Sequence, residues 1–371
     1  MSENEKRIAG FDFLRLVMVV SVIMLHSAMT YMMFVPQWWY VIDDRRSFGM
    51  ALLVVFLDSF PMSELFFLAG YFAPPSLSKR GAYRFLREKF MRIGLPWIIG
   101  VVFVAPFFAY ASYLKFGLGP VSVYAFIKNF FLGPFYMQGH YWFLGILFLF
   151  LVIYAALRKD GNEIQRGTHA GAAAPIAALW LASAVSYYLA AYFIKPADEW
   201  LNIGYVLYFQ HARIVGYAGF FALGIHAWRR GWFTPEGWTP NPVPWGVCGI
   251  LSSVLLLHWK FFAAPALGAQ ENAVLDAILY NSVMISMTIF LAGLFLKIGG
   301  LPGKAVKILT PYSYSIYWLH QIVLMPIVYF LKPFDFDILI KWAGANVFTV
   351  FVCFVLSARF LKRAPLLRRI F

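Results

Sequence analysis

The chain has 371 residues, of which 61% are hydrophobic and only 13% are charged, and its mean hydropathy is +0.70. Soluble domains average about 45–50% apolar and about 25% charged residues, so this composition excludes an ordinary soluble protein and indicates a polytopic membrane protein. The net charge of +14 suggests nucleic acid in a soluble protein, but in a membrane protein the sidedness of the loops explains it, and we expect no nucleic-acid partner. The predicted fold class is all-α, with residues 1–371 forming one bundle of transmembrane helices.

Runs of about 20 apolar residues, the length that crosses a bilayer as a helix, occur ten times along the chain. The first segment follows MSENEKRIAG, which lacks the small-residue cleavage site of a signal peptide, so we expect it to be retained as a span. The ten predicted spans are residues 11–35, 48–74, 93–114, 141–157, 173–194, 205–227, 244–263, 276–296, 310–331 and 342–361.

Basic residues are distributed unevenly between the two sets of loops. If the N-terminus is cytoplasmic, 22 of the 31 basic residues fall on the inner side. Cytoplasmic loops are rich in Lys and Arg, so the sequence predicts that both termini are cytoplasmic. The inner set includes Arg158, Lys159, Arg166, Arg229, Arg230, Arg368 and Arg369.

The first span contains two ionisable residues, Arg15 and His26. Eleven residues separate them, which is about 1100° of helix rotation, so both side chains share one helix face about 16 Å apart along the axis. Arg15 is then near the inner surface and His26 beyond mid-depth. Ionisable groups inside a membrane are functional candidates by default. The alternatives are that Arg15 snorkels to the surface and that His26 is a hydrogen-bonded core residue.

A carboxylate and a basic run follow in the second span and the loop after it. Glu64 lies within the apolar part of PMSELFFLAGYFAPP, where it could pair with His26, pair with another cation or bond the backbone. Residues 79–92 then hold six basic side chains in 14 positions. This density suits a positive-inside anchor and equally an anion site for phosphates.

Further polar residues occur in three later spans. His140, Tyr141 and Trp142 open the fourth span, where an aromatic belt explains most of the pattern. YFQHARIVGY places polar side chains at the outer end of the sixth span, either as a ligand-recognition cluster or as a solvated rim. His320 lies near mid-depth of the ninth span, where a structural hydrogen bond and a catalytic role are both open. The polar residues of the sixth span are Gln210, His211 and Arg213.

Five motifs stand in order along the chain: Asp12, Arg15 and His26, then Phe66 to Tyr71, Arg92 to Pro96, Trp142 to Leu144 and Ser313 to His320. In this order they resemble acyltransferase family 3, the integral membrane O-acyltransferases, over nearly the whole chain. Within the family, the chain is most similar to the glucans biosynthesis protein C branch, whose members are thought to succinylate periplasmic glucans. That finer resemblance rests on AGYF after Glu64, the lack of a secreted esterase-like domain and the terminal RAPLLRRIF.

The resemblance implies a bacterial inner-membrane enzyme with acyl-CoA (succinyl-CoA or acetyl-CoA) as cytosolic donor and an extracytoplasmic glycan as acceptor. It implies no permanently bound cofactor. No H-E-x-x-H or other metal spacing occurs, so we expect no metal. The rival function is a transporter of a small anionic solute, but we find no inverted repeat.

Acyl transfer needs a base for the acceptor hydroxyl, and histidine suits this role. We expect His26 to be that base or, alternatively, an acyl-carrying nucleophile. Glu64 is then expected to orient its ring and Arg15 to hold the donor or steady charge. The expected contacts to coenzyme A are Arg84, Arg87, Lys89 and Arg92, and the expected substrate contacts are Asp12, Trp142, Gln210, His211, Arg213, Tyr317 and His320.

Overall fold

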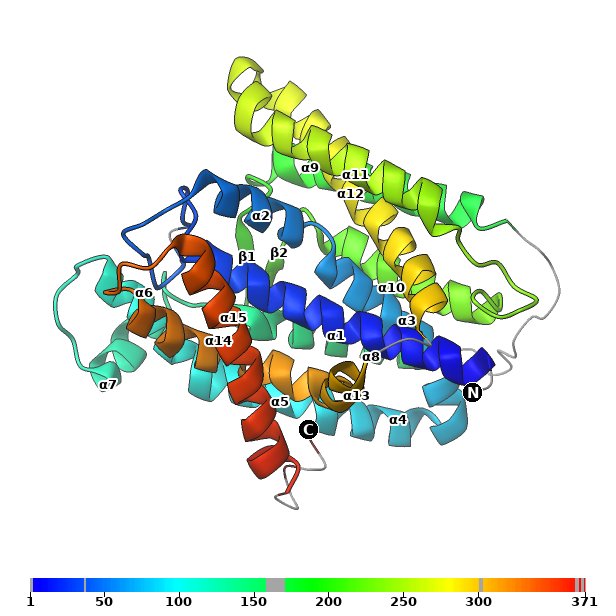
Figure 1. The fold of residues 1–371 in the computed structure, drawn as a ribbon, viewed down its shortest axis with the longest axis horizontal. Coiled ribbons are helices and arrows are strands. Elements are labelled where there is room, and N and C mark those ends of the chain that lie inside the picture. Colours follow the sequence, from blue (N-terminus) through cyan, green and yellow to red (C-terminus); the bar gives the residue numbers. More distant parts are fainter. Residues whose placement is uncertain are drawn as a thin grey trace.

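A computed structural model describes residues 3–36, 38–157, 171–299, 303–363, 367 and 370. Within these residues, nine helices are long and apolar enough to cross a membrane, and the only strands form one two-stranded sheet. The predicted polytopic helical bundle is therefore confirmed (Figure 1). Five residues of the predicted inner basic set lie outside the described residues: Arg158, Lys159, Arg166, Arg368 and Arg369.

Several helices follow one another directly or after a short turn. Single π-helical turns, such as Phe90–Gly94 and Gly100–Val104, join α4, α5 and α6 into one continuous helical segment, Ala82–Lys115. The helices are α1 (Glu3–Met29), α2 (Phe48–Asp58), α3 (Pro61–Arg80), α4 (Ala82–Lys89), α5 (Leu95–Ile99), α6 (Ala105–Lys115), α7 (Val123–Phe126), α8 (Trp142–Leu157), α9 (Ala173–Phe193), α10 (Ile214–Arg229), α11 (Pro242–His258), α12 (Ala269–Ile298), α13 (Lys304–Leu309), α14 (Ser313–Leu331) and α15 (Ile338–Leu356).

Helix α1 runs through the middle of the bundle (Figure 1) and packs against α2, α3, α12, α14 and α15. Its buried residues lie on several sides, including Phe11, Leu14 and Ile23, all with no exposed surface. A helix that buries apolar residues on several sides is expected at the centre of a bundle rather than at its rim. Residues on α1 therefore lie where side chains from many other helices can reach them.

Small residues let α3 and α10 cross closely. A Cβ atom on Gly70 would lie 2.0 Å from the carbonyl oxygen of Phe221, and one on Gly224 would lie 2.1 Å from that of Phe67. No larger side chain fits at either position without moving a backbone. Small residues at the contact between two membrane helices allow such a close approach of their backbones.

The predicted sixth span, residues 205–227, is wrong in its first part. That part is an antiparallel hairpin of β1 (Trp200–Ile203) and β2 (Leu207–Gln210), and α10 begins only at Ile214. The hairpin turns through Gly204 and Tyr205, with φ of 61° and 59°. A short apolar run rich in Val, Leu, Tyr and Phe does not by itself separate a strand from a helix. With 16 residues, α10 is about 24 Å long, less than the hydrocarbon thickness.

The bundle has two distinct ends, which we name for use below. The basic end carries the N-terminus, the junction of α3 with α4 and the start of α13, including Arg80, Arg84 and Lys304 (Figure 1). The hairpin end carries the loop of residues 30–47 and the hairpin with its flanking residues 194–213. Non-helical backbone is tolerated inside a membrane where it lines a cavity. The hairpin lines the cavity described below.

Candidate functional site

Three histidines from distant parts of the chain meet inside the bundle. His26 comes from α1, His140 from the turn Gly139–Tyr141 before α8, and His320 from α14. The His26 and His320 rings are stacked with centroids 5.0 Å apart, and the His140 and His320 rings are 4.4 Å apart. His140 and His320 are buried, whereas His26 is partly exposed. His26 is therefore the most exposed member of the cluster.

Hydrogen bonds set the tautomers of this cluster. Nδ1 of His320 lies 2.6 Å from the carbonyl oxygen of Tyr317, and a carbonyl can only accept, so His320 Nδ1 carries the hydrogen. In the neutral ring, Nε2 of His320 then accepts from Nδ1 of His26 at 2.8 Å. The hydrogen of His26 is thereby held on Nδ1. Its Nε2 keeps a lone pair, which faces the Gln321 amide nitrogen at 3.3 Å.

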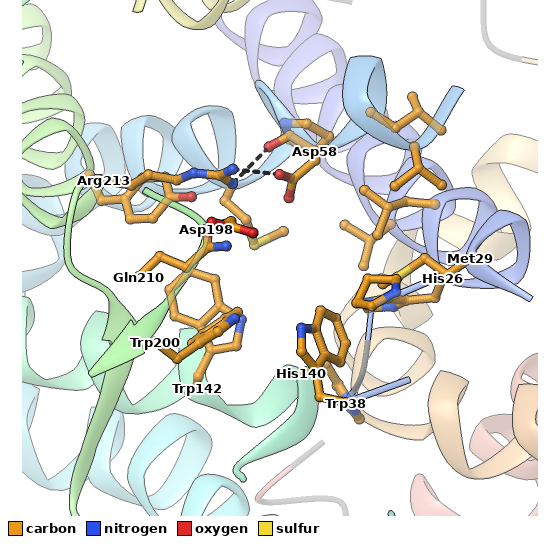
Figure 2. A pocket seen from close by; sticks show the side chains of 18 of the residues that line it. His26, Met29, Trp38, Asp58, His140, Trp142, Asp198, Trp200, Gln210 and Arg213 are labelled. Atoms are coloured by element: carbon orange, nitrogen blue, oxygen red, sulfur yellow. Dashed lines mark hydrogen bonds and ion pairs between the residues drawn. The ribbon is translucent and has the colours of Figure 1, made fainter. Parts of the chain in front are cut away.

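His26 faces a cavity of about 190 Å³ on the side of the hairpin end. Figure 2 shows His26 and Met29 on one wall, with Asp58 and Arg213 across the open space. Figure 2 also shows tryptophan rings below that space, and His140 beside them. A small number of polar groups among apolar and aromatic walls is typical of ligand sites. The labelled lining residues are His26, Met29, Trp38, Asp58, His140, Trp142, Asp198, Trp200, Gln210 and Arg213.

An ion pair forms the wall opposite His26. A guanidinium nitrogen of Arg213 lies 2.6 Å from Oδ2 of Asp58, and the guanidinium stands 4.4 Å from the ring centroid of Tyr280. The Tyr280 hydroxyl donates to the backbone oxygen of Asp58 at 3.0 Å. These contacts tie the start of α10 to the break between α2 and α3. The predicted substrate residue Arg213 therefore lines the cavity in a fixed position.

The hairpin supplies two further cavity residues. Trp200 and Gln210 are register partners across the two strands, and both line the cavity. The Trp200 ring stacks on Tyr208, with centroids 5.0 Å apart, and meets the edge of Trp142 at 5.4 Å. Gln210 and Trp142, both expected as substrate contacts, line this cavity.

His211 was predicted to contact substrate, but the structure gives it another place. Its Nδ1 lies 3.1 Å from the carbonyl oxygen of Glu199, and its Nε2 lies 3.0 Å from that of Lys195. Both ring nitrogens thus face the backbone that leads into the hairpin, and His211 does not line the cavity. The side chain holds the hairpin in place, and the expectation of a direct substrate contact is wrong for this structure.

A second cavity, of about 210 Å³, lies along α1 toward the basic end. Its walls are almost wholly apolar, with Arg15 and Lys89 as the cationic members. Arg15 pairs with Asp12 at 2.7 Å and stands 5.8 Å from the centroid of Phe72. Arg15 and His26 therefore line two cavities on one helix rather than a single polar site. Tyr317 belongs to the lining of both.

The other predicted coenzyme A contacts lie outside this second cavity. Arg84 and Arg87 are exposed on α4, and exposed Arg92 lies in the π-helical turn that follows it. Arg92 is 3.7 Å from Glu88, which also pairs with Arg80 at 2.7 Å. The three exposed guanidinium groups lie on either side of Lys89 in the sequence, and solvent reaches each of them.

Glu64 does not orient His26. It is fully buried on α3, and neither of its carboxyl oxygens has a hydrogen-bond partner among the described residues. The ring nitrogens of His26 face His320 and Gln321 instead. The expected pair is wrong because α14 packs beside this part of α1 and brings His320 to it.

Sequence reasoning missed several cavity residues as site members. Asp58 carried a usable signal, since it is a lone acid in an apolar run, and Gln321 directly follows His320. His140 was interpreted mainly as part of an aromatic belt. Asp198, Trp38 and Trp200 lie in or next to loops, where nothing in the sequence distinguishes them from ordinary interfacial residues.

The comparison with known families gives one match. The family model for acyltransferase family 3, described as an acyltransferase domain, matches residues 8–358. No curated protein and no solved structure matches the chain. The matched span includes every residue of the two cavities along α1.

Proposed function

Because the chain belongs to acyltransferase family 3 and is a multi-pass membrane acyltransferase, we propose that it moves an acyl group from cytosolic acyl-CoA to a hydroxyl of an extracytoplasmic glycan. The observation that carries this proposal is the pair of cavities along α1, which share the single residue Tyr317. One holds a histidine among polar and aromatic groups, and the other holds cations among apolar walls. A donor and an acceptor that approach from opposite ends could meet at the shared residue.

His26 is the proposed base. Its Nε2 takes the proton of the acceptor hydroxyl while the hydroxyl oxygen attacks the thioester carbonyl carbon. The new ester bond forms, the carbon–sulfur bond breaks, and the thiolate of coenzyme A leaves and takes up a proton. General-base catalysis of this kind contributes about 10²–10⁴ in rate. His320 holds the His26 ring through Nδ1 at 2.8 Å, and the acceptor hydroxyl replaces the Gln321 amide at the Nε2 lone pair.

The cavity beside His26 suits a sugar acceptor. The C–H faces of a pyranose ring pack well on aromatic faces, and Trp38, Trp142 and Trp200 all line this cavity. Sugar hydroxyls need both hydrogen-bond donors and acceptors, which Asp198 and Gln210 supply there. We propose a glucan as this acceptor, in keeping with the resemblance to the glucans biosynthesis protein C branch.

The cavity beside Arg15 suits the donor. The slender pantetheine arm of coenzyme A fits apolar walls, and the phosphates at its far end require cations. Lys89 and Arg15 line the cavity itself. Exposed Arg84, Arg87 and Arg92 lie on the same segment and can bind phosphate bidentately. We propose succinyl-CoA or acetyl-CoA as donor, with the basic end in the cytoplasm of a bacterial inner membrane.

The direct test is acyl transfer by the purified full-length protein in proteoliposomes. Isotope-labelled succinyl-CoA or acetyl-CoA and a periplasmic glucan are supplied, and mass spectrometry follows the acyl mass added to the glucan. The matched control replaces His258, an exposed histidine at the end of α11. We expect transfer by the wild type and by His258→Ala, and transfer at least about 100-fold slower by His26→Ala. Uptake of solute without any acylated glucan would contradict the proposal and favour a transporter.

A further inference from the structure

A third cavity lies apart from the two along α1, in a groove between α6 and α14. It has a volume of about 860 Å³ and is lined by apolar side chains from both helices, with one lysine from each side. Phe107 is 54% exposed and Tyr329 is 70% exposed, so the groove opens on the lipid-facing surface of the bundle. The residues that carry the argument below are Phe107, Leu114, Met325, Tyr329, Lys115 and Lys332.

The two lysines of the groove occupy equivalent places. Lys115 is the last residue of α6, and Lys332 directly follows the last residue of α14. Nζ of Lys115 donates to the carbonyl oxygen of Trp39 at 2.7 Å. Nζ of Lys332 lies 3.5 Å from Asp44, whose side chain is 89% exposed, and solvent weakens such a contact. The groove therefore has cations at one end and apolar walls along its length. A lipid with an anionic headgroup and acyl chains has the complementary charge and polarity.

A buried hydroxyl gives a second indication of a ligand. Tyr40 lines this groove and is only 7% exposed, and its hydroxyl has no hydrogen-bond partner among the described residues. Buried hydroxyl groups are normally paired. The ester carbonyls of a glycerolipid are hydrogen-bond acceptors close to its phosphate. Tyr40 is likewise close to Lys115, because it directly follows Trp39, whose carbonyl oxygen accepts from Lys115.

We propose that this groove binds one phospholipid with an anionic headgroup, with the phosphate at Lys115 and Lys332 and an acyl chain along Phe107 and Met325. The site adjoins the histidine cluster without being part of it. Tyr40 also lines a small cavity that includes His26, and the rings of Tyr40, Trp39 and His26 form a stack with centroid distances of 4.4 and 5.7 Å. The lipid site stands independently of the proposed acyl transfer.

Lipid retention tests this proposal without any measurement of activity. The full-length protein is reconstituted with equal amounts of phosphatidylglycerol and phosphatidylcholine, extracted in mild detergent, and analysed for retained lipid by mass spectrometry. We expect the wild type to retain phosphatidylglycerol preferentially. The double variant Lys115→Gln/Lys332→Gln should lose that preference by at least about fivefold, since each basic residue near an anionic lipid surface contributes about that factor.

Two further variants distinguish lipid binding in the groove from attraction of anionic lipid to surface charge in general. Lys128→Gln removes an exposed lysine outside the groove lining and should leave the preference unchanged. Met325→Trp fills the groove without a change in charge, and should reduce retention of both lipids even if the double lysine variant fails to insert. Equal retention of the two lipids by the wild type, or undiminished retention by Met325→Trp, would overturn the proposal.

Discussion

The cavity at His26 and the cavity at Arg15 lie against the same helix, and their walls are chemically opposite. Around His26, α14 supplies another histidine and the hairpin supplies Trp200 and Gln210. Around Arg15, the neighbours are almost all apolar, with Lys89 as the other cation. The helical period places both residues on one face of α1, but the elements packed at each level decide what each can do. One cavity has the groups for proton transfer, and the other has the groups to hold an anionic molecule with an apolar arm.

The largest effect in this comparison should come from His26→Ala. We expect the turnover number for acyl transfer to fall by about 10²–10⁴, because the base is lost. The Michaelis constant for acyl-CoA should stay unchanged, since the donor cavity is intact. Steady-state kinetics in proteoliposomes give both quantities, with His258→Ala as the matched control. Near-normal turnover of His26→Ala would place the chemistry elsewhere.

The next effect concerns His320 as a positioning residue. His320→Ala removes the acceptor for His26 Nδ1 and should lower turnover by about 10–100-fold, by analogy with loss of the group that orients a metal-bound histidine. His320→Gln can offer an amide oxygen to Nδ1 and should recover part of that loss. A purely structural role predicts instead that Gln and Ala variants are equally impaired and equally reduced in thermal stability.

A smaller effect should separate the donor cavity from the histidine cluster. Lys89→Gln combined with Arg92→Gln should raise the Michaelis constant for acyl-CoA about tenfold, the value of one or more lost charge-assisted hydrogen bonds. Turnover at saturating donor and the Michaelis constant for glucan should change little. If donor kinetics are unaltered in correctly inserted protein, the basic segment serves only to orient the chain in the membrane.

The smallest effect belongs to the hairpin. Gln210→Ala should raise the Michaelis constant for the glucan by about threefold to tenfold, since one hydrogen bond to a neutral hydroxyl contributes about 0.5–1.5 kcal/mol. Donor kinetics should be unaffected. A change in the donor constant instead of the acceptor constant would reverse the assignment of the two cavities.

The bundle itself could be predicted because span-length apolar runs have few structural alternatives. The shared face of Arg15 and His26 followed from helix geometry alone. The partner of His26 could not be predicted, because the packing of α1 against α14 depends on the whole bundle and not on local pattern. Glu64 was chosen for its charge, whereas the ring found beside His26 is that of His320.

The hairpin was missed for a different reason. Residues 205–210 are as apolar as a helical span. The turn between the strands is marked by the positive φ at Tyr205, which only the structure shows. Its consequence for the site is large, because Trp200 and Gln210 reach the cavity from this hairpin. Loop residues such as Asp198 carried no periodic signal, so only the three-dimensional structure assigns them to the site.

Sidedness of the reaction tests the central claim most directly. The protein is reconstituted in sealed vesicles, and its orientation is scored in a parallel sample by trypsin cleavage at exposed Arg84. Labelled acyl-CoA is then supplied on one side of the membrane and glucan on the other. The two-cavity account predicts acylated glucan only when the donor is on the side of residues 79–92 and the acceptor is on the hairpin side. Equal transfer with both substrates on the hairpin side would contradict it.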